Sequence, residues 1–452
     1  MTISAPKELL ELSRMAVPRY TSYPTAPHFS SDVSSTTYSK WLRATRDAGE
    51  PISLYLHVPF CQELCSYCGC STKATRRQEP VRAYAAVLHQ EIELLHRELG
   101  RISVKHIHWG GGTPNILPKD VFSALLDDLK SRFVFTDDME HAIELDPRFL
   151  TADGAQHLAG CGVTRVSLGI QTLDPKVQRA ITRVQPLERV EAAFKALRAA
   201  GIRQINADLM YGLPFQSETS IEDTMREVAR LRPDRLAVFG YAHVPWMKKH
   251  QTLFCEADLP DAAARLAQAR LARKLLVAAG YDEIGIDHFA VPEDELSQAA
   301  KAGTLRRNFQ GYTTDTAETL VGIGASSISK TASGYAQNAP DVRGWQRMVE
   351  AGELPIARGR LLENDDVLRS SVIEDILCSF RVNLAQSELQ EAGIDGTDPI
   401  LVERLAPLAD KGWVEVTRDG VEIRQHPYEI ARIVASAFDA YLGTGGRHSS
   451  AV

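Results

Sequence analysis

Between residues 50 and 290, short segments rich in Val, Ile and Tyr alternate with longer segments that have helical periodicity. This alternation is typical of repeated strand–helix units, which build either a parallel barrel or an open parallel sheet. Three joins also resemble one another, because LAGCGVTRVSLGI, ALRAAGIRQINADLM and LVAAGYDEIGIDHF each run from a helix through Ala-Gly into a strand. Glycine commonly ends a helix in the left-handed conformation, so these joins predict the same structural step.

Seven strands are predicted from the short segments. In parallel barrels and open α/β sheets, catalytic and ligand-binding groups gather at the C-terminal ends of the strands. The residues that follow each strand are therefore the first candidates for a site. The predicted strands are 52–58, 104–109, 142–146, 165–171, 205–210, 235–241 and 282–289.

The two ends of the chain do not follow the repeat. PRYTSYPTAPHF (18–29) has no clear period and predicts an ordered loop or arm. Beyond about residue 365 the pattern becomes helix, hairpin, helix, with Asp419-Gly420 as the expected hairpin turn. We therefore predict three parts. They are an N-terminal arm (1–50), a barrel (51–365) and a small, mainly helical domain of winged-helix type (366–452).

Charge and hydropathy exclude some partners. A formal net charge of -7 argues against nucleic acid, whose partners carry a basic surface. The first residues lack a basic start followed by an apolar run, and no apolar stretch approaches the roughly 18 residues that span a bilayer. We therefore expect a cytoplasmic protein that binds neither nucleic acid nor a membrane.

Four of the seven cysteines lie within ten residues, at positions 61, 65, 68 and 70. In a long chain without a secretion signal, such a group indicates metal binding rather than disulfides. Cys61, Cys65 and Cys68 follow strand 52–58, and three thiolates there can ligate three irons of a 4Fe-4S cubane and leave the fourth iron open. A zinc site that uses all four cysteines is the alternative.

Glycines and polar residues follow the other predicted strands. Gly110 to Gly112 and Thr113 follow strand 104–109, where bare backbone allows a polar ligand to approach, although a glycine triplet alone is more often only a turn. A carboxylate at the end of strand 142–146 could accept hydrogen bonds from ribose hydroxyls. The repeated placement of such residues predicts a shared cavity. The others are Glu144, Asp146, Gln171, Arg183, Asp208 and Ala242.

The cysteine spacing, with Tyr67 before the third cysteine, resembles the signature of the radical S-adenosylmethionine superfamily. Further segments resemble one family within it, the oxygen-independent coproporphyrinogen III oxidases, over nearly the whole chain. These segments are RYTSYPTA (19–26), HVPFC (57–61) with the cysteines after it, GGGTP (110–114), DHFA (287–290), NFQGYTT (308–314) and GIGASSIS (322–329).

This resemblance implies an α/β fold of the partial (β/α)6 type, similar to a TIM barrel. It implies the oxidative decarboxylation of two propionate side chains of coproporphyrinogen III to vinyl groups, which gives protoporphyrinogen IX in haem synthesis without oxygen. The implied cofactors are a 4Fe-4S cluster and S-adenosylmethionine, with a second S-adenosylmethionine beside the first and a 5'-deoxyadenosyl radical as the reactive species. We also expect a monomer and a low-potential electron donor such as a flavodoxin or ferredoxin.

The resemblance also assigns residues to the two S-adenosylmethionine molecules. Arg183 and Asp208 suit the carboxylate and the ammonium of a methionine group, respectively. Those around the cluster-bound molecule are Tyr55, Gly111, Glu144 and Ile328, and those around the second are Tyr67, Gly112, Thr113, Gln171, Arg183, Asp208 and Ala242.

Cys70, Arg19 and Tyr20 are candidates for a catalytic role. Cys70 corresponds to a fourth cysteine typical of the family that does not ligate the cluster. Arg19 and Tyr20 lie on an arm that resembles a segment covering the active site, and Arg19 could pair with a propionate. The alternative function is a related haem-binding chaperone without decarboxylase activity, whose members lack this arm and the fourth cysteine.

Overall fold

The computed structural model describes residues 7–443, which divide into two compact units. The first, called here the cysteine unit, comprises Phe29–Asp208 and Asp315–Leu362. The second, the C-terminal unit, comprises the described residues of Met1–His28, Leu209–Thr314 and Glu363–Val452. Because the units interleave along the chain, the three-part division at residues 50 and 365 stays a prediction.

The cysteine unit is built on a mostly parallel sheet with the strand order β16-β15-β14-β13-β1-β4-β5-β6-β7. Strand β1 pairs in parallel with both β13 and β4, and β4, β5 and β6 continue the parallel ladder. The other edge, β14 to β16, is antiparallel. The strands are β1 (Ile52–Val58), β4 (Ser103–Gly111), β5 (Val134–Leu145), β6 (Arg165–Gln171), β7 (Gln204–Tyr211), β13 (Leu320–Ile323), β14 (Ile328–Thr331), β15 (Gly334–Asn338) and β16 (Ile356–Leu361).

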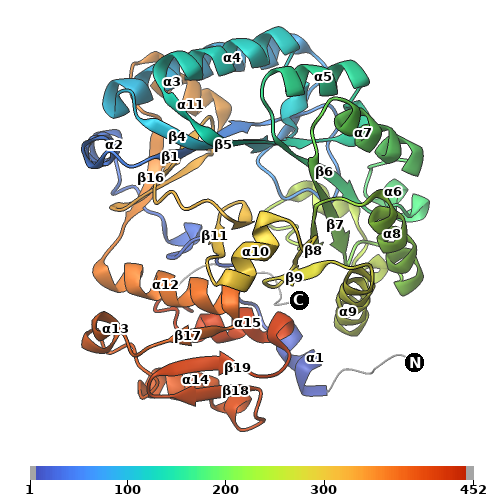
Figure 1. Ribbon diagram of the computed structural model, residues 1–452, viewed down its shortest axis with the longest axis vertical. Helices are drawn as coiled ribbons and strands as arrows, with labels where there is room; N and C mark the ends of the chain where they lie inside the picture. Colours follow the sequence, from blue (N-terminus) through green and yellow to red (C-terminus); the bar gives the residue numbers. More distant parts are fainter. Residues whose placement is uncertain (1–6, 444–452) are drawn as a thin grey trace. The chain divides into compact units, whose positions relative to one another are not determined.

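Helices cover the outer side of this sheet, as Figure 1 shows for α3 and α4. Strand β1 buries six of its seven residues, as expected for a central parallel strand covered on both faces. Each fully buried Leu or Ile contributes about 1.5–3 kcal/mol. The helices are α2 (Ser35–Ala48), α3 (Gln78–Leu99), α4 (Lys119–Arg132), α5 (Ala152–Gly160), α6 (Pro175–Ala180), α7 (Leu187–Ala199) and α11 (Val342–Glu350), with the short 3-10 helices η2 (Pro114–Ile116) and η3 (Pro147–Phe149).

The C-terminal unit contains the strand order β8-β10-β9, which is antiparallel. The sequence predicted one strand over 282–289, and this is wrong. Gly285 adopts a positive φ of 55° and turns the chain, and a Cβ there would overlap the ring of Tyr312. The elements are α1 (Lys7–Ser13), η1 (Ala26–His28), α8 (Glu218–Leu231), β8 (Arg235–Gly240), η4 (Lys249–Leu253), η5 (Glu256–Asp258), α9 (Ala262–Ala278), β9 (Asp282–Ile284), β10 (His288–Ala290), α10 (Glu295–Ala302), β11 (Arg306–Asn308) and β12 (Gly311–Thr313).

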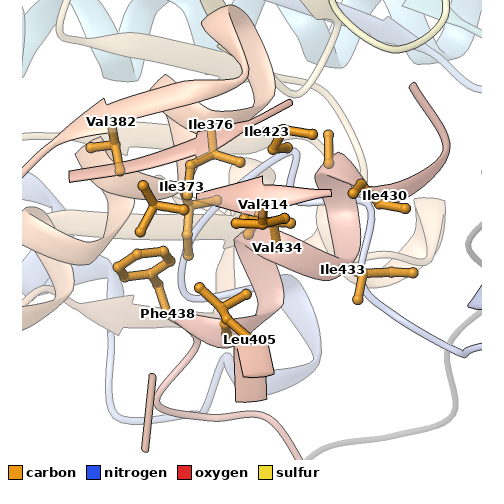
Figure 2. Close-up of a cluster of buried hydrophobic side chains, with 14 of the residues drawn as sticks. Ile373, Ile376, Val382, Leu405, Val414, Ile423, Ile430, Ile433, Val434 and Phe438 are labelled. Carbon is orange, nitrogen blue, oxygen red and sulfur yellow. The ribbon is translucent and has the colours of Figure 1, made fainter. Parts of the chain in front are cut away.

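The last eighty residues of the described chain form helices around a three-stranded sheet of order β17-β19-β18. Their apolar side chains, including Ile376, Leu405 and Val434, make one buried cluster (Figure 2). The predicted order helix, hairpin, helix is confirmed, although Gly420 begins β19 and the two turn residues are 418 and 419. The elements are α12 (Asn364–Ser379), β17 (Arg381–Asn383), α13 (Ser387–Glu391), α14 (Pro399–Ala409), β18 (Val414–Thr417), β19 (Gly420–Ile423) and α15 (Pro427–Ala437).

Within residues 7–443, no helix combines the length and the apolar character needed to cross a membrane.

Candidate functional site

The cysteine loop leaves the sheet directly after β1. Its two ends are tied together by the short parallel pair β2 (Phe60–Cys61) and β3 (Lys73–Ala74), with hydrogen bonds from Lys73 N to Pro59 O and from Thr75 N to Cys61 O. Inside the loop, Cys68 N donates to Cys65 O at 3.2 Å. The backbone therefore holds Cys61, Cys65 and Cys68 on one short closed loop at the C-terminal end of a strand.

Positive charge lies beside the middle cysteine. Arg183 Nη1 is 3.5 Å from Cys65 Sγ, and Arg148 Nη2 is 4.0 Å from the same sulfur. Positive charge beside a sulfur offsets the negative charge of a metal centre ligated by thiolates. The loop thus offers three thiols together with positive charge, and this donor set fits an iron–sulfur cluster.

Asp146 positions both guanidinium groups. It is buried, and its carboxylate accepts hydrogen bonds from Arg183 Nη1 at 3.0 Å and from Arg148 Nη2 at 2.8 Å. Burial alone would raise the pKa of Asp146, but Arg183 and Arg148 hold it below its usual value. A buried, doubly paired carboxylate has little capacity left for ribose hydroxyls, so of the two carboxylates at the end of this strand Glu144 is the better candidate for that role.

The thiols of the loop are not arranged as the ligand set of one metal ion. Among the described residues, no three His, Cys, Asp or Glu side chains are grouped as ligands of one metal ion. A cubane does not require such a group, since each thiolate binds a different iron. Burial raises the pKa of Cys61 to about 11, so cluster binding must displace a proton from this thiol.

A hydrogen-bonded chain connects β1 to the far side of the cysteine loop. His57 Nε2 lies 2.9 Å from the carbonyl of Ser71, which can only accept, so Nε2 carries the proton. His57 Nδ1 then accepts from Tyr55 Oη at 3.1 Å. Burial lowers the pKa of His57, which keeps the ring neutral. Tyr55 and His57 therefore fix the loop that carries the cysteines.

The glycine triplet is required by close packing against this loop. A Cβ on Gly111, which has a φ of 112°, would lie 2.8 Å from the His57 ring, and one on Gly112 would overlap Phe60 O. Gly112 N also donates to Val58 O at 2.8 Å. Thr113 is buried, and its hydroxyl donates to Asn115 and accepts from Asp146 N. The triplet thus brings β4 against the cysteine loop.

Two further carboxylates lie in the C-terminal halves of strands β5 and β7. Glu144 accepts from Gly111 N at 3.3 Å and is hydrogen-bonded to His108 Nε2 at 3.1 Å, while its side chain stays 42% exposed. This partial exposure leaves Glu144 able to contact a ligand. Asp208 accepts from Ser167 Oγ at 2.6 Å and from Asn206 Nδ2 at 2.9 Å.

Gln171 ends β6 with a positive φ of 67°, an unusual conformation for a residue with a side chain. A Cβ on Gly169 would be 2.9 Å from Gln171 Nε2 and 3.2 Å from Arg183 Nη2, so this glycine leaves room for both polar groups. Tyr67 is half-buried, and burial raises the pKa of its hydroxyl. Ile328 is half-buried at the start of β14.

Cys70 is exposed, and its backbone N–H donates to Cys68 Sγ at 3.4 Å. A backbone donor to a ligand sulfur is a common way to tune a cluster. The Cys70 thiol is itself hydrogen-bonded to Cys68, and this bond, followed by burial, raises the pKa of the thiol. The structure therefore gives position 70 contacts with the loop through both its main chain and its side chain.

The remaining candidates belong to the C-terminal unit. Tyr20 is buried with a φ of 47°, and its hydroxyl donates to Asp439 Oδ2 at 2.9 Å. Arg19 Nη2 donates to Gly240 O at 2.9 Å. Ala242 follows β8 and accepts from Gln251 Nε2 at 3.3 Å through its carbonyl. The contact of Tyr20 is structural, whereas Arg19 lines a pocket that is described below.

Sequence reasoning missed His57, His108 and Arg148, and it did not predict that Asp146 pairs with two arginines. His57 and His108 stand inside predicted strands, where polar residues at alternating positions were a usable signal. Arg148 carried no such signal, since only the fold brings it to Cys65 across 83 residues.

Comparison with known proteins agrees with this geometry. The model of the radical SAM superfamily matches residues 55–228. The fold and site thus define a radical S-adenosylmethionine enzyme.

Curated relatives narrow this class. Oxygen-independent coproporphyrinogen III oxidases from Bradyrhizobium diazoefficiens and Paracoccus denitrificans are 45% and 41% identical to this chain. The matches cover 96% of this chain and 97% of the first relative, and 98% of both chains for the second. The chain belongs to the family of oxygen-independent coproporphyrinogen III oxidases.

A solved structure of coproporphyrinogen III oxidase from Escherichia coli, described as a radical SAM enzyme, matches with a TM-score of 0.90 and 37% identity. The match covers 98% of this chain and 100% of the Escherichia coli chain. The predicted fold class, a partial barrel with a mostly parallel sheet, is therefore confirmed. The family resemblance and the prediction of an oxidoreductase are confirmed as well.

Proposed function

We propose that this chain converts coproporphyrinogen III to protoporphyrinogen IX by decarboxylating two propionate side chains without oxygen. The observation that carries the proposal is the closed loop of Cys61, Cys65 and Cys68 at the end of β1, in a chain that matches the oxidases over nearly its whole length. The haem-chaperone alternative is not favoured, because the full-length relatives are oxidases.

When bound, a 4Fe-4S cluster and S-adenosylmethionine supply the 5'-deoxyadenosyl radical that removes a hydrogen atom from a propionate. The protein's own part is to hold the thiolates and to shield them. Arg183 and Arg148 hold Cys65 beside positive charge. Tyr55 and His57 fix the loop through the carbonyl of Ser71.

Residues at the strand ends are proposed to bind two S-adenosylmethionine molecules. Glu144, whose carboxylate is partly exposed, suits hydroxyl donors of the cluster-bound molecule. Tyr55, Gly111 and Ile328 complete that group. The second molecule is assigned to Tyr67, Gly112, Thr113, Gln171, Arg183, Asp208 and Ala242.

Within this second group, the contacts inside the protein separate two kinds of residue. The Thr113 hydroxyl is already hydrogen-bonded to Asn115 and to Asp146 N, so Thr113 supports the site by holding these neighbours in place. Arg183 has a buried Nε without a partner, which leaves one donor for an anionic group. We therefore assign Arg183 to a carboxylate contact and Thr113 to a supporting one.

A low-potential flavodoxin or ferredoxin is the proposed electron donor, since the radical reaction begins with one electron. A cytoplasmic location and a monomer are proposed as well. All seven cysteines lie in the described part of the chain and none forms a disulfide, which suits a reducing compartment.

The test is anaerobic turnover of the reconstituted protein with coproporphyrinogen III, S-adenosylmethionine and a reductant. We expect release of carbon dioxide and formation of protoporphyrinogen IX. Cys61→Ser removes a ligand and should abolish both the cluster absorbance and turnover. Cys255→Ser is the matched control, because Cys255 is an exposed thiol outside the loop. Tight haem binding without carbon dioxide release would support the chaperone instead.

A further inference from the structure

The C-terminal unit contains a pocket whose lining is rich in arginine. One segment that carried the family resemblance lines this pocket, and one arginine beside a second such segment lines it too. Asp287 begins DHFA, and Arg307 directly precedes NFQGYTT. The lining includes two carboxylates, Asp287 and Glu429, and six arginines, namely Arg19, Arg265, Arg270, Arg273, Arg307 and Arg432.

Two of these arginines are balanced by carboxylates. Arg270 Nε lies 2.7 Å from Glu429 Oε1, and Arg273 Nε lies 3.2 Å from Glu283 Oε1. Glu429 Oε2 is buried without a hydrogen-bond partner among the described residues. Four further arginines line the pocket together with Asp287, namely Arg19, Arg265, Arg307 and Arg432.

Arg19 and Arg307 bind main-chain carbonyls instead of carboxylates. Arg19 Nη2 donates to Gly240 O at 2.9 Å, and Arg307 Nη2 donates to Arg19 O at 3.3 Å. Neither makes an ion pair with a carboxylate within the described chain. Nε and Nη1 of Arg307 are buried without a hydrogen-bond partner there. Buried guanidinium donors without partners are costly, so an anion that accepted hydrogen bonds from them would be stabilised here.

Arg265 and Arg432 add to this positive charge. Arg265 Nη1 donates to Tyr241 O at 2.8 Å, and Arg432 Nη2 donates to Val17 O at 2.6 Å. Burial, and then the positive charge of Arg19, lower the pKa of Arg432 to about 10, so the guanidinium groups repel one another while staying charged. An added anion would relieve this repulsion.

The backbone makes room for one of these groups. A Cβ on Gly212 would lie 3.0 Å from Arg265 Nη1, and one on Gly240 would lie 3.4 Å from Arg265 Nη2. Tyr211 lies beneath the same guanidinium, with its ring centroid 6.0 Å from Cζ. The arginine is therefore held in place before any ligand arrives.

The cavity has a volume of about 90 Å³, which holds a few waters or a short acid side chain but not a tetrapyrrole ring. We propose that this pocket binds a propionate carboxylate of the substrate through Arg19, Arg265, Arg307 and Arg432. The inference rests on the proposed function and adds the residues that recognise the substrate's acidic side chains. Planar guanidinium groups match a carboxylate through paired hydrogen bonds.

Equilibrium binding of coproporphyrin III, a stable fluorescent tetracarboxylate, to the anaerobic holoenzyme tests the proposal. Arg307→Gln and Arg19→Gln should each raise the Kd about ten- to hundred-fold, as expected for loss of a charge-assisted hydrogen bond. Arg307→Lys, which keeps the charge, should recover part of the affinity. Far-UV circular dichroism and amide hydrogen exchange at Leu405 and Val434 are followed in each variant to show that the C-terminal unit has folded.

The matched control is Arg226→Gln, which removes an arginine with a 66% exposed side chain in the same unit, and the Kd should stay unchanged. The tetramethyl ester of coproporphyrin III carries no charge, so its binding should not respond to Arg307→Gln. An equal loss for acid and ester, or less than a two-fold change for the acid, would overturn the pocket assignment. Wild-type protein that binds the porphyrin but releases no carbon dioxide from coproporphyrinogen III would instead contradict the proposed function.

Discussion

At the scale of single residues, Arg183 connects the cysteine loop to two strands. Its guanidinium is buried and donates to Asp146 at 3.0 Å, to Gly169 O at 2.6 Å and to Cys65 Sγ at 3.5 Å. Removing one member of a buried ion pair leaves its partner without compensation. Arg183 therefore stabilises the fold and the cluster ligand with one side chain.

Arg183→Gln should lower the free energy of unfolding by about 2–4 kcal/mol, less than a fully isolated partner would cost, because Arg148 still pairs with Asp146. An iron chelator should remove the cluster about ten-fold faster than from wild type, since groups around metal ligands typically change affinity by that factor. Denaturant unfolding and the decay of cluster absorbance measure the two effects. Arg179→Gln, an exposed position in the same unit, is the control. If Arg183→Gln lowers the free energy of unfolding but leaves the rate of cluster loss unchanged, Arg183 stabilises the fold and not the cluster.

The sequence predicted the cluster ligands and Arg183 but not how they act together. Cys61, Cys65 and Cys68 are readable because their spacing is local. Arg183 meets Asp146 across 37 residues and Cys65 across 118. Pairings over such distances follow from strand order, which short patterns do not specify.

At the scale of elements, helix α3 carries a buried carboxylate that fixes the loop after β13. Glu91 accepts from Gly324 N at 2.7 Å, Asn338 Nδ2 at 2.6 Å and Trp345 Nε1 at 2.9 Å. Burial raises the pKa of Glu91 from 4.5 to about 7, and the three hydrogen bonds lower it only in part. The segment that this network holds, 322–329, includes Ile328 of the proposed cofactor site.

A raised pKa in the folded state predicts a pH-dependent stability. The folded protein binds the Glu91 proton more tightly than the unfolded chain does. The contribution of this protonated carboxyl to the free energy of unfolding is therefore fully present below pH 4.5 and is lost as the pH rises through about 7. Relative to Glu91→Gln, wild type should lose up to about 3 kcal/mol across this range. Urea unfolding at several pH values measures the difference. Glu93→Gln replaces an exposed carboxylate on the same helix and should leave the pH dependence of the unfolding free energy as it is in wild type. A difference between wild type and Glu91→Gln that does not vary with pH would contradict the raised pKa of Glu91.

The strands that the sequence predicted best are the central ones. The predicted ranges 52–58 and 165–171 match β1 and β6, because parallel strands covered on both faces are short apolar runs bounded by turns. The antiparallel edge β14 to β16 was not predicted, and 282–289 was wrong. Edge strands and tight turns depend on neighbours such as Tyr312 beside Gly285, which are distant in sequence.

At the scale of the whole molecule, the two units are stabilised in different ways. The cysteine unit has a parallel sheet with a metal-binding loop at its strand ends. The last part of the C-terminal unit has an apolar cluster from α12, α14, α15 and their strands (Figure 2). This apolar core contains no cysteine of the loop. The stability of the apolar core should therefore not depend on a bound iron–sulfur cluster.

Removal of the iron–sulfur cluster should loosen only the cysteine loop, residues 59–75. Without the iron–sulfur cluster, this loop keeps the β2–β3 pair and a few backbone hydrogen bonds, among them the bond from Ser66 N to Ile181 O at 3.0 Å. Local opening then costs little, so amide hydrogen exchange there should rise at least about ten-fold. Helices α14 and α15 bury their own apolar faces, and exchange at Leu405 and Val434 should stay within about two-fold of the loaded protein. Exchange that rises together in both regions would show that the cluster supports the entire fold.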